Sequence, residues 1–422
     1  MGKLENKLEK IVSLAKEASF KLALVDTVVK NRILIQMADA LLKEKNKIVS
    51  ANKKDLEAAR RKRLSAAFID RLTLDETRIQ QMSASLIELS KLDDPVGGVI
   101  KSWERPNGLK ISKVRVPIGV ILIIYESRPN VTADCIGLCL KSSNCVILRG
   151  GSDALNSNKA IFDILNKVAM KNGIAQGSIS FIDSTERKAV DALLKFDDYI
   201  DLVMPRGGEG LINEVKNKSR IPVIKHYKGI CHVYVDSEAD LNMAHRIVFN
   251  AKVQRPGVCN AMETLLVHKD AAVRFLPAMI KELQDAGCEI RGCALTKKVA
   301  RNLKNIKSAK DKDWSTEYLD LILSVRVVDS LDEAIEHINK YGSRHSDSIV
   351  TDDKNNARRF LKEIDSACVF VNASTRFTDG YQFGMGAEIG ISTDKLHARG
   401  PMGLEELTTY KYIIEGSGQI RR

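Results

Sequence analysis

An apolar run at residues 118–124 constrains the fold of this chain more than any other feature. A strand without polar side chains has to be buried on both faces, which is typical of the parallel sheets of α/β proteins. A helical pattern follows at residues 131–141, and a second apolar strand at residues 145–149. The alternation then continues with a helix at 156–172, a strand at 178–182, a helix at 186–194 and strands at 200–204 and 221–224. The pattern predicts a doubly wound α/β sheet.

A second α/β pattern spans residues 241–370. It consists of strands at 264–267, 324–328, 348–351 and 368–371 and of helices at 271–283 and 334–340, the last after a capping box at 330–333. We therefore expect an α/β fold with two doubly wound domains. From residue 371 to 403 the chain is polar and rich in glycine, and a loop of this length in a compact domain is usually functional.

The first part of the chain has a different pattern. Residues 1–95 are helical in periodicity, with a predicted capping box at residues 73–76. Residues 98–116 alternate apolar and polar side chains around a turn at 106–108, which predicts a β-hairpin. A hairpin set between helices and a buried sheet has open edges that need a cover.

The composition excludes several classes of protein. No apolar run is long enough to span a membrane, and the amino terminus lacks the apolar stretch of a signal peptide, so we expect a cytoplasmic protein without a membrane partner. Eight cysteines in 422 residues, without a Cys-x-x-Cys pair, indicate neither a disulfide scaffold nor a metal site.

The net charge of +12 suits either nucleic acid or small anionic ligands. The basic residues are scattered along the chain, and no stripe interleaves them with aromatic side chains. The densest run, residues 60–63, lies in a helical segment and is explained by a solvated helix face. We therefore expect no nucleic-acid partner.

Cys259 is the candidate nucleophile. It follows a Pro-Gly turn at residues 256–257 and precedes an apolar strand. A turn at the end of a strand holds a thiol rigidly and lets it face a cleft, and a catalytic nucleophile needs both. Because most cysteines outside disulfides are small core residues, the position alone leaves both interpretations open. Cys135 and Cys139 are interpreted as core residues, and Cys288 and Cys293 have no histidine at zinc-site spacing.

Two glycine turns follow predicted strands, at residues 149–152 and 205–208. Doubly wound sheets bind ligands at the carboxyl ends of their strands. Free backbone N–H groups at the start of a helix also suit phosphate. Neither turn has the GxGxxG pattern, and such turns often only make a tight corner.

Three long motifs stand out, at residues 125–132 (YESRPNVT), 371–379 (VNASTRFTD) and 397–405 (HARGPMGLE). Together with a dispersed pattern between Val328 and Ile349, they resemble the aldehyde dehydrogenase superfamily over nearly the whole chain. More narrowly, the chain resembles the members that reduce γ-glutamyl phosphate.

The resemblance implies roles for individual residues. Cys259 is the nucleophile, and Asn130 stabilises the oxyanion together with the Cys259 N–H group. The implied cofactor-binding residues are Arg149, Gly150, Gly151, Ser152, Pro205, Arg206, Gly207, Gly208 and Glu317. The implied substrate-binding residues are Arg128, Asn372, Ser374, Thr375, Arg376 and Arg399. A guanidinium group pairs well with oxyanions, although each arginine also fits a role as a loop anchor. His226, His345 and His397 fit either an acid or a structural histidine, and no step is assigned to them.

Two departures from the superfamily refine the expected activity. Oxidising members have a Glu-Leu-Gly-Gly segment whose glutamate activates water, whereas residues 225–229 (KHYKG) lack that carboxylate here. The usual Gly-Gln-x-Cys is also replaced by Pro-Gly-Val-Cys at 256–259. The resemblance then implies NADPH-dependent reduction of γ-glutamyl 5-phosphate to glutamate 5-semialdehyde through a Cys259 thioester. Phosphate is released, and the reaction is the second step of proline biosynthesis from glutamate.

The resemblance also implies a division into domains. An NADPH-binding domain is expected at residues 1–97, 117–240 and 371–404, and a catalytic domain at 241–370. An oligomerisation element at 98–116 and 405–422 would make the chain a homo-oligomer. Non-covalent association with a separate glutamate 5-kinase stays open.

Two other functions fit parts of the sequence pattern. A phosphate-independent aldehyde dehydrogenase is disfavoured by the absent glutamate. A basic RNA-binding protein on an inactive dehydrogenase fold is disfavoured by the presence of Cys259 and Asn130.

Overall fold

A computed structural model describes residues 2–225 and 228–421. The chain forms two compact units. Unit 1 consists of Met1–Lys225, Gly384–Gly390 and Met402–Arg422, and unit 2 of His226–Phe383 and Ile391–Pro401. Within the described ranges, no helix combines the length and the apolar character that a membrane crossing requires.

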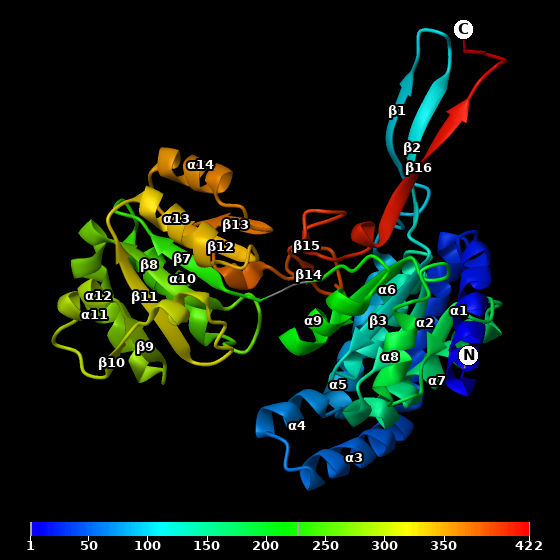
Figure 1. Ribbon diagram of the computed structural model, residues 1–422, viewed down its shortest axis with the longest axis horizontal. Helices are drawn as coiled ribbons and strands as arrows, with labels where there is room; N and C mark the ends of the chain where they lie inside the picture. The colour runs from blue at the N-terminus through cyan, green and yellow to red at the C-terminus, as the bar shows by residue number, and fades with distance from the viewer. Residues whose placement is uncertain (1, 226–227, 422) are drawn as a thin grey trace. The chain divides into compact units, whose positions relative to one another are not determined.

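Unit 1 contains a parallel sheet of four strands in the order β5 (Ile179–Phe181), β4 (Cys145–Gly150), β3 (Val120–Tyr125) and β6 (Leu202–Arg206). Figure 1 labels β3 among the helices of unit 1. All six residues of β3 are buried, as the apolar run predicted. The strand expected at residues 221–224 is reduced to a single bridge between Val203 and Val223. The order of the strands reverses at β3, which is the point where a doubly wound sheet binds its ligand.

The helices of unit 1 cover this sheet and extend it. They are α1 (Lys3–Leu22), α2 (Thr27–Lys43), α3 (Lys45–Arg61), α4 (Ala66–Leu72), α5 (Glu76–Lys91), α6 (Asn130–Lys141), α7 (Leu155–Lys171), α8 (Arg187–Leu193) and α9 (Glu209–Lys218). α1 packs on the sheet and on α8, whereas α6 contacts the sheet, α5 and α7. The predicted capping box at 73–76 is wrong, because Thr73 ends α4 and Asp75 caps α5 by accepting from the Arg78 N–H group at 2.8 Å.

A second sheet of unit 1 is antiparallel and has three strands, β1 (Val99–Glu104), β2 (Lys110–Pro117) and β16 (Thr408–Glu415). The predicted hairpin is confirmed as β1 and β2. β16, near the carboxyl end of the chain, pairs along the other edge of β2, from Thr408 opposite Pro117 to Glu415 opposite Lys110. The strand that covers β2 therefore comes from the opposite end of the sequence.

Unit 2 contains a parallel sheet of seven strands. Their order is β10 (Ile306–Ser308), β9 (Glu289–Gly292), β11 (Ile322–Val328), β8 (Met262–His268), β7 (Cys231–Val235), β12 (Ser346–Val350) and β13 (Cys368–Val371). Alternate residues of each strand enter different cores. Val233 and Leu265 belong to the larger core, whereas Tyr234 and Leu266 belong to the other.

Helices complete unit 2. They are α10 (Leu241–Val253), α11 (Lys269–Asp285), α12 (Ala294–Val299), α13 (Leu331–Tyr341) and α14 (Lys354–Glu363). The larger core includes residues of α10 and α11, and the other core residues of α13 and α14. The side chain of Ser330 accepts from the Glu333 N–H group, so that α13 begins near the predicted cap. The glycine-rich stretch adds a two-strand ladder of β14 (Ile391–Ser392) and β15 (Gly400–Pro401).

The α/β class with parallel sheets is confirmed, whereas the boundaries of the compact units differ from the expected domains. β7 was expected in the cofactor domain, but it pairs with β8 and β12 and therefore belongs to unit 2. Residues 371–383 and 391–401 also belong to unit 2, and only 384–390 and 402–404 of that expected segment lie in unit 1.

Candidate active site

Cys259 lies in the turn that joins α10 to β8, at the amino end of β8. Its side chain is partly exposed, whereas six of the eight cysteines are buried. The Cys231 thiol donates to the Cys259 carbonyl oxygen at 3.2 Å. The neighbouring Asn260 accepts at its own carbonyl oxygen from the Thr375 hydroxyl at 2.7 Å, and its side-chain amide donates to the Thr378 carbonyl at 2.8 Å. The turn is therefore fixed on both sides of a thiol that can still be reached.

Arg376 lies beside this turn. Its Nε donates to the Gln254 side chain at 2.9 Å, and its guanidinium also binds the Asn260 side-chain oxygen. Burial and the charge of Arg255 lower the pKa of Arg376, whereas Cys259 raises it. The hydrogen bonds to Gln254 and Asn260 thus hold a cation at the turn that carries Cys259.

Glu317 is connected to Cys259 through Gly229. The Gly229 N–H group donates to Glu317 Oε1 at 2.8 Å. A Cβ atom at Gly229 would lie 1.8 Å from the Cys259 carbonyl oxygen, so the two backbones are in direct contact. The structure therefore brings an expected cofactor-binding residue to the nucleophile turn. His226 falls outside the described residues.

The motif at residues 371–379 separates into two parts. The Asn372 side chain accepts from the Thr351 N–H group at 2.9 Å and donates to the Thr351 carbonyl at 3.0 Å, at the carboxyl end of the sheet. Cys259 lies at the amino end, so Asn372 is not brought to the thiol. The chain then turns back along β12, where Ser346 donates to the Thr378 hydroxyl at 2.7 Å.

The turned-back segment carries the other three expected residues. Thr375 and Arg376 contact Asn260, as described above. Ser374 accepts from the Arg376 N–H group at 3.3 Å and so begins a short 3-10 turn at Thr375–Phe377. Ser374 thus stabilises the backbone that presents Arg376.

Arg399 makes an ion pair. Its Nη1 lies 2.9 Å from Asp365, which also binds Lys395 at 2.8 Å. Lys395 first, and Arg399 after it, lower the pKa of Asp365. This is the loop-anchoring contact that the sequence left open as the alternative to substrate binding.

The two described candidate histidines differ. His345 is fully buried, with Nδ1 at 2.8 Å from the Ser346 hydroxyl, and burial lowers its pKa to about 4. A neutral, buried imidazole is a structural group and a poor acid at neutral pH. His397 lies between β14 and β15 in the left-handed region of backbone space, at φ 72°.

The expected cofactor-binding residues of unit 1 gather at the carboxyl edge of the four-stranded sheet. Arg149 and Gly150 end β4, and Pro205 and Arg206 end β6. A Cβ atom at Gly150 would lie 2.2 Å from the side-chain amide nitrogen of Asn158, so a larger residue would require Asn158 to shift. Gly151 and Ser152 continue into a 3-10 turn, and Gly207 and Gly208 lead into α9.

The Arg149 guanidinium has an N–H group without a hydrogen-bond partner among the described residues, at the carboxyl edge of the four-stranded sheet. Its Nη2 donates to the Thr185 carbonyl at 3.3 Å, and its buried Nε has no hydrogen-bond partner in the described structure. Burial and the charge of Arg187 lower the pKa of Arg149. Two cations that repel each other favour an anionic ligand near them.

Glu126 makes a contact that the sequence did not predict, although this residue lies within the motif at residues 125–132. Its carboxylate accepts from the Gly208 N–H group at 2.9 Å, at the start of α9. The Glu126 carboxylate therefore occupies the Gly208 N–H group at this helix terminus.

Arg128 lies in the turn between β3 and α6, and Asn130 follows that turn. Asn130 is the first residue of α6, and its Nδ2 donates to Asp134 at 3.2 Å. Burial raises the pKa of Asp134 to about 6, and the Asn130 hydrogen bond opposes this shift. The expected site residues are therefore divided between unit 1, with Asn130, Arg128 and the glycine turns, and unit 2, with Cys259, Glu317, Arg376 and Arg399.

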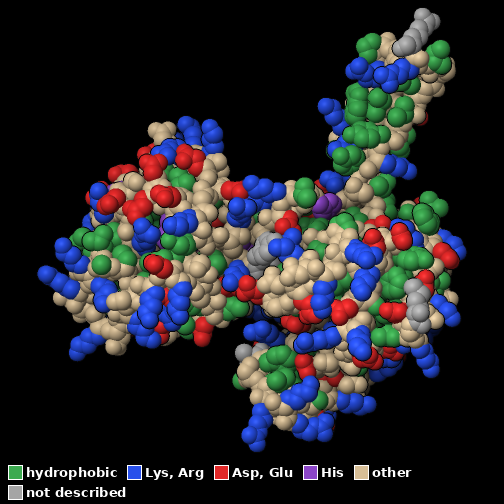
Figure 2. Space-filling view, in the orientation of Figure 1, with side chains coloured by type: hydrophobic (Ala, Val, Ile, Leu, Met, Phe, Trp, Pro, Cys, Tyr) green, Lys and Arg blue, Asp and Glu red, His purple; other side chains and the backbone are tan. Residues whose placement is uncertain are grey.

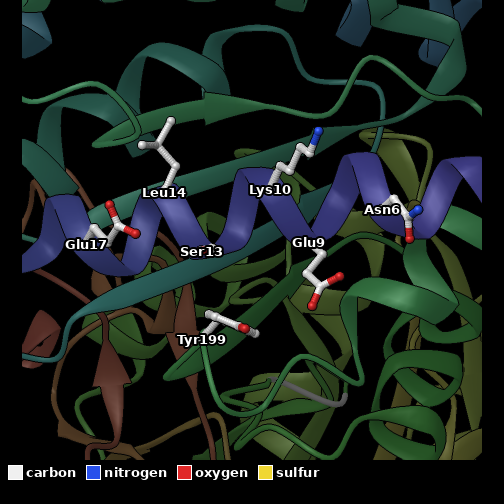
Figure 3. A pocket seen from close by; sticks show the side chains of 7 residues that line it. All are labelled: Asn6, Glu9, Lys10, Ser13, Leu14, Glu17 and Tyr199. Atoms are coloured by element: carbon white, nitrogen blue, oxygen red, sulfur yellow. The ribbon is translucent and has the colours of Figure 1, made fainter. Parts of the chain in front are cut away.

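An open groove on α1 holds none of these residues. Its lining consists of Asn6, Glu9, Lys10, Ser13, Leu14, Glu17 and Tyr199, and Figure 3 shows Glu9 and Tyr199 on the same side of the helix. Its lining contains no cysteine and no histidine. No cluster of three or more metal-ligating side chains occurs among the residues that the structure describes.

The chain belongs to the aldehyde dehydrogenase family, whose sequence model matches residues 3–290 and 306–413. Within that family it groups with the γ-glutamyl phosphate reductases. It is 60% identical to the γ-glutamyl phosphate reductase of Caldanaerobacter subterraneus subsp. tengcongensis over 97% of this chain and 98% of that protein. The γ-glutamyl phosphate reductase of Clostridium novyi is 54% identical over 99% of this chain and 100% of that protein.

Solved structures agree with this placement. The crystal structure of γ-glutamyl phosphate reductase from Thermotoga maritima has a TM-score of 0.96 and 48% identity, over 98% of this chain and 100% of that one. An acetylating aldehyde dehydrogenase from Geobacillus thermoglucosidasius has a TM-score of 0.70 at 16% identity, over 100% of this chain and 98% of that one, which shows the shared fold alone. The resemblance inferred from the motifs is confirmed.

Proposed function

We propose that this chain reduces γ-glutamyl 5-phosphate to glutamate 5-semialdehyde with NADPH and releases phosphate, as the second step of proline biosynthesis from glutamate. The observation that carries the proposal is the 60% identity to a γ-glutamyl phosphate reductase over 97% of the chain. The partly exposed thiol of Cys259, in a turn fixed by Cys231 and Asn260, supports it.

The first half of the reaction occurs at Cys259. Its thiolate attacks the carbonyl carbon of the acyl phosphate, the carbon–oxygen bond to phosphate breaks, and a thioester remains. Arg376 supports the thiolate through its charge. The Cys259 N–H group and Asn130 are the proposed donors to the oxyanion, and one such donor contributes about 3–4 kcal/mol in comparable enzymes.

The second half of the reaction reduces the thioester and regenerates the Cys259 thiol. NADPH, when bound, supplies a hydride to the thioester carbon. The carbon–sulfur bond at Cys259 then breaks, the aldehyde leaves, and the sulfur regains the proton that it lost. No step requires activated water, which agrees with the absence of a carboxylate in residues 225–229.

The carboxyl edge of the sheet in unit 1 suits NADPH. Arg149 has a buried, unsatisfied Nε, and Arg187 lies close enough for the two charges to interact. A 2′-phosphate would pair with such cations, and the glycine turns at 150–151 and 207–208 let a pyrophosphate approach the backbone. Glu317 is the proposed partner of the nicotinamide ribose.

The substrate is also an anion. Arg128, Arg376 and Arg399 are the proposed partners of its phosphate and α-carboxylate, with Asn372, Ser374 and Thr375 in supporting roles. Arg376 has the best support because it lies at the Cys259 turn, whereas Arg399 would have to share its guanidinium with Asp365. The net charge of +12 would steer both polyanions toward the protein.

The three-stranded sheet is the proposed oligomerisation element. It exposes large hydrophobic side chains at Val99, Ile100, Tyr410, Tyr412, Ile413 and Ile414. Figure 2 shows hydrophobic side chains gathered over this sheet, between lysines and arginines. The open edges of β1 and β16 add unpaired backbone groups, which favour pairing with another copy. Association with a glutamate 5-kinase stays a prediction.

The test is a direct assay. A glutamate kinase supplies γ-glutamyl phosphate from glutamate and ATP, and consumption of NADPH is recorded together with the semialdehyde formed. We expect both only when the kinase, glutamate and ATP are all present. NADPH consumption that does not depend on the acyl phosphate would refute the proposal.

A further inference from the structure

A buried ion pair closes the base of the loop that carries Cys259. Lys252 lies at the end of α10 and Glu263 at the start of β8, and both side chains are 0% exposed. Lys252 Nζ donates to Glu263 Oε2 at 2.6 Å. The pair therefore joins the two elements that bound the nucleophile turn.

The second oxygen of Glu263 binds another segment. Oε1 accepts from the N–H groups of Tyr318 and Leu319, both at 3.1 Å. Leu319 has a backbone φ of 54°, a conformation that costs free energy for this residue type and needs support from its surroundings. Lys252 Nζ also lies 6.0 Å from the centre of the Tyr318 ring. One carboxylate thus connects α10, β8 and the segment at residues 317–319.

This segment leads back to the nucleophile. Glu317 immediately precedes Tyr318, and its carboxylate accepts from the Gly229 N–H group at 2.8 Å. Gly229 in turn packs against the backbone of Cys259. Glu263 is therefore connected to Cys259 by two routes, along its own strand and through Glu317 and Gly229.

We propose that Lys252 and Glu263 are positioning residues, which hold the Cys259 turn and the Glu317 carboxylate in one fixed geometry. The inference rests on the proposed function, because it assigns a role around the same thiol. A buried ion pair is weak evidence for stability, since a well-packed apolar pair of similar volume is often as stable. The three hydrogen bonds of Glu263, one to Lys252 and two to the segment at residues 317–319, instead fix the relative positions of these elements. Loss of comparable supporting contacts around metal ligands typically changes affinity or activity by about 10- to 100-fold.

The test compares Glu263→Gln with Glu317→Gln and with the double variant. Glu263→Gln should raise the dissociation constant for NADPH, measured by fluorescence without substrate, by about tenfold. If Glu263 acts through Glu317, the double variant should bind NADPH no more weakly than Glu317→Gln alone, because the two changes affect one interaction. Amide hydrogen exchange should become faster at residues 254–261 and 316–321.

Lys30→Met is the matched control. Lys30 is also a buried lysine, 1% exposed and paired with Asp94, but it belongs to unit 1. The Lys30→Met variant should have a lower melting temperature, with unchanged NADPH binding and unchanged hydrogen exchange at residues 254–261 and 316–321. If Glu263→Gln does not fold, Glu263→Asp keeps the charge beside Lys252 and withdraws the oxygen from Tyr318 and Leu319, with the same expected effects.

Three results would overturn the proposal. They are unchanged exchange in both segments, additive effects of the Glu263 and Glu317 variants, and failure of both Glu263 variants to fold, which would make the pair a stabilising element only. Hydrogen exchange needs neither substrate nor cofactor. A wild-type protein that does not reduce γ-glutamyl phosphate would therefore remove the proposed function while the exchange result still decides the role of the pair.

Discussion

The backbone of Gly229 is packed so closely against Cys259 that a Cβ atom at position 229 would lie 1.8 Å from the Cys259 carbonyl oxygen and 2.5 Å from its Cα. Position 229 ends the segment that lacks the carboxylate of the oxidising family members. The same residue donates its N–H group to Glu317. A glycine at this position therefore lets three segments of unit 2 meet at the nucleophile.

Gly229→Ala tests this contact. The added methyl group has to displace the backbone of the Cys259 turn, and a displacement of about 1 Å at a reacting group can lower the rate by about 100-fold. We expect a loss of kcat of that size with a folded protein, as judged by circular dichroism. Gly210→Ala is the control, because a Cβ atom there meets nothing within 4 Å. Full activity of Gly229→Ala would show that the turn tolerates the shift.

Cys259→Ser should abolish reduction while the fold and NADPH binding are retained. A hydroxyl without an adjacent base is a far weaker nucleophile than a thiolate. Steady-state rates decide the matter: a variant that keeps more than about a hundredth of the wild-type rate, a loss that one oxyanion donor alone can cause, would exclude Cys259 as the nucleophile. Alanine at Cys135, Cys139, Cys288 or Cys293 should leave the chemistry nearly unchanged.

NADPH should be preferred to NADH. Arg149 lies at the carboxyl end of β4, and burial, followed by the charge of Arg187 at the start of α8, lowers its pKa. A 2′-phosphate would pair with these cations. Arg149→Met should then lower kcat/KM for NADPH by about tenfold, the loss expected for one charged hydrogen bond, and leave NADH unaffected. Equal efficiency of the wild-type protein with both cofactors would contradict the assignment.

The fold shows where sequence patterns were sufficient. The apolar run at 118–124 identified β3 because burial on both faces leaves a composition that no other element shares. The same argument did not place β7, whose mixed sequence (CHVYV) includes the buried His232. His232 binds Asp347 at 2.9 Å, and a polar pair inside a sheet hides the strand from a hydrophobicity pattern.

The candidate active site shows a different limit of prediction from sequence patterns. Cys259 was found from the Pro-Gly turn and the apolar strand around it, and Arg376 from a long motif, and the structure brings Arg376 to the Cys259 turn. Asn372 stands in the same motif as Arg376 but lies at the opposite end of the sheet, since the chain reverses after β13. Glu263 was not recognised, although a carboxylate inside a buried strand is costly without a partner and was therefore a signal for Lys252 or another cation.

Two buried histidines should each weaken the fold in acid, within a defined pH window. Burial lowers the pKa of His345 to about 4 and that of His337 to about 2, so both are neutral in the fold above a pH of about 5. The unfolded chain protonates both histidines below a pH of about 6.5. The contribution of each histidine to the free energy of unfolding should therefore fall as the pH falls from about 6 to 4, by up to about 1.4 kcal/mol per pH unit. Asp134, whose pKa burial raises to about 6, contributes with the opposite sign in this window.

Urea unfolding at several pH values measures this slope. His345→Gln removes one of the two histidines that bind a proton in the unfolded chain but not in the fold. The slope of the free energy of unfolding against pH should therefore be smaller by up to about 1.4 kcal/mol per pH unit, whatever the variant does to stability at neutral pH. An unchanged slope would mean that His345 titrates in the folded protein as it does in the unfolded chain.

The reverse reaction should require phosphate. The thiohemiacetal at Cys259 would lose its hydride to NADP+, and the thioester that remains needs an acceptor for its acyl group. Oxidising relatives cleave it with water activated by a glutamate, and residues 225–229 offer no carboxylate. The cations Lys225 and Lys228 favour an anionic acceptor, so phosphate, or arsenate in its place, should be the group that enters.

The measurement is NADPH formation from glutamate 5-semialdehyde over many turnovers, after enzymatic removal of phosphate. We expect at most one turnover without phosphate and sustained turnover once phosphate or arsenate is added. Glu317 is the carboxylate that the structure connects to Gly229, so Glu317→Gln serves as the control for hydrolysis by that group. Sustained formation of free glutamate without phosphate would show that another residue activates water, and the acyl-phosphate reductase would have to be reassigned as an aldehyde dehydrogenase.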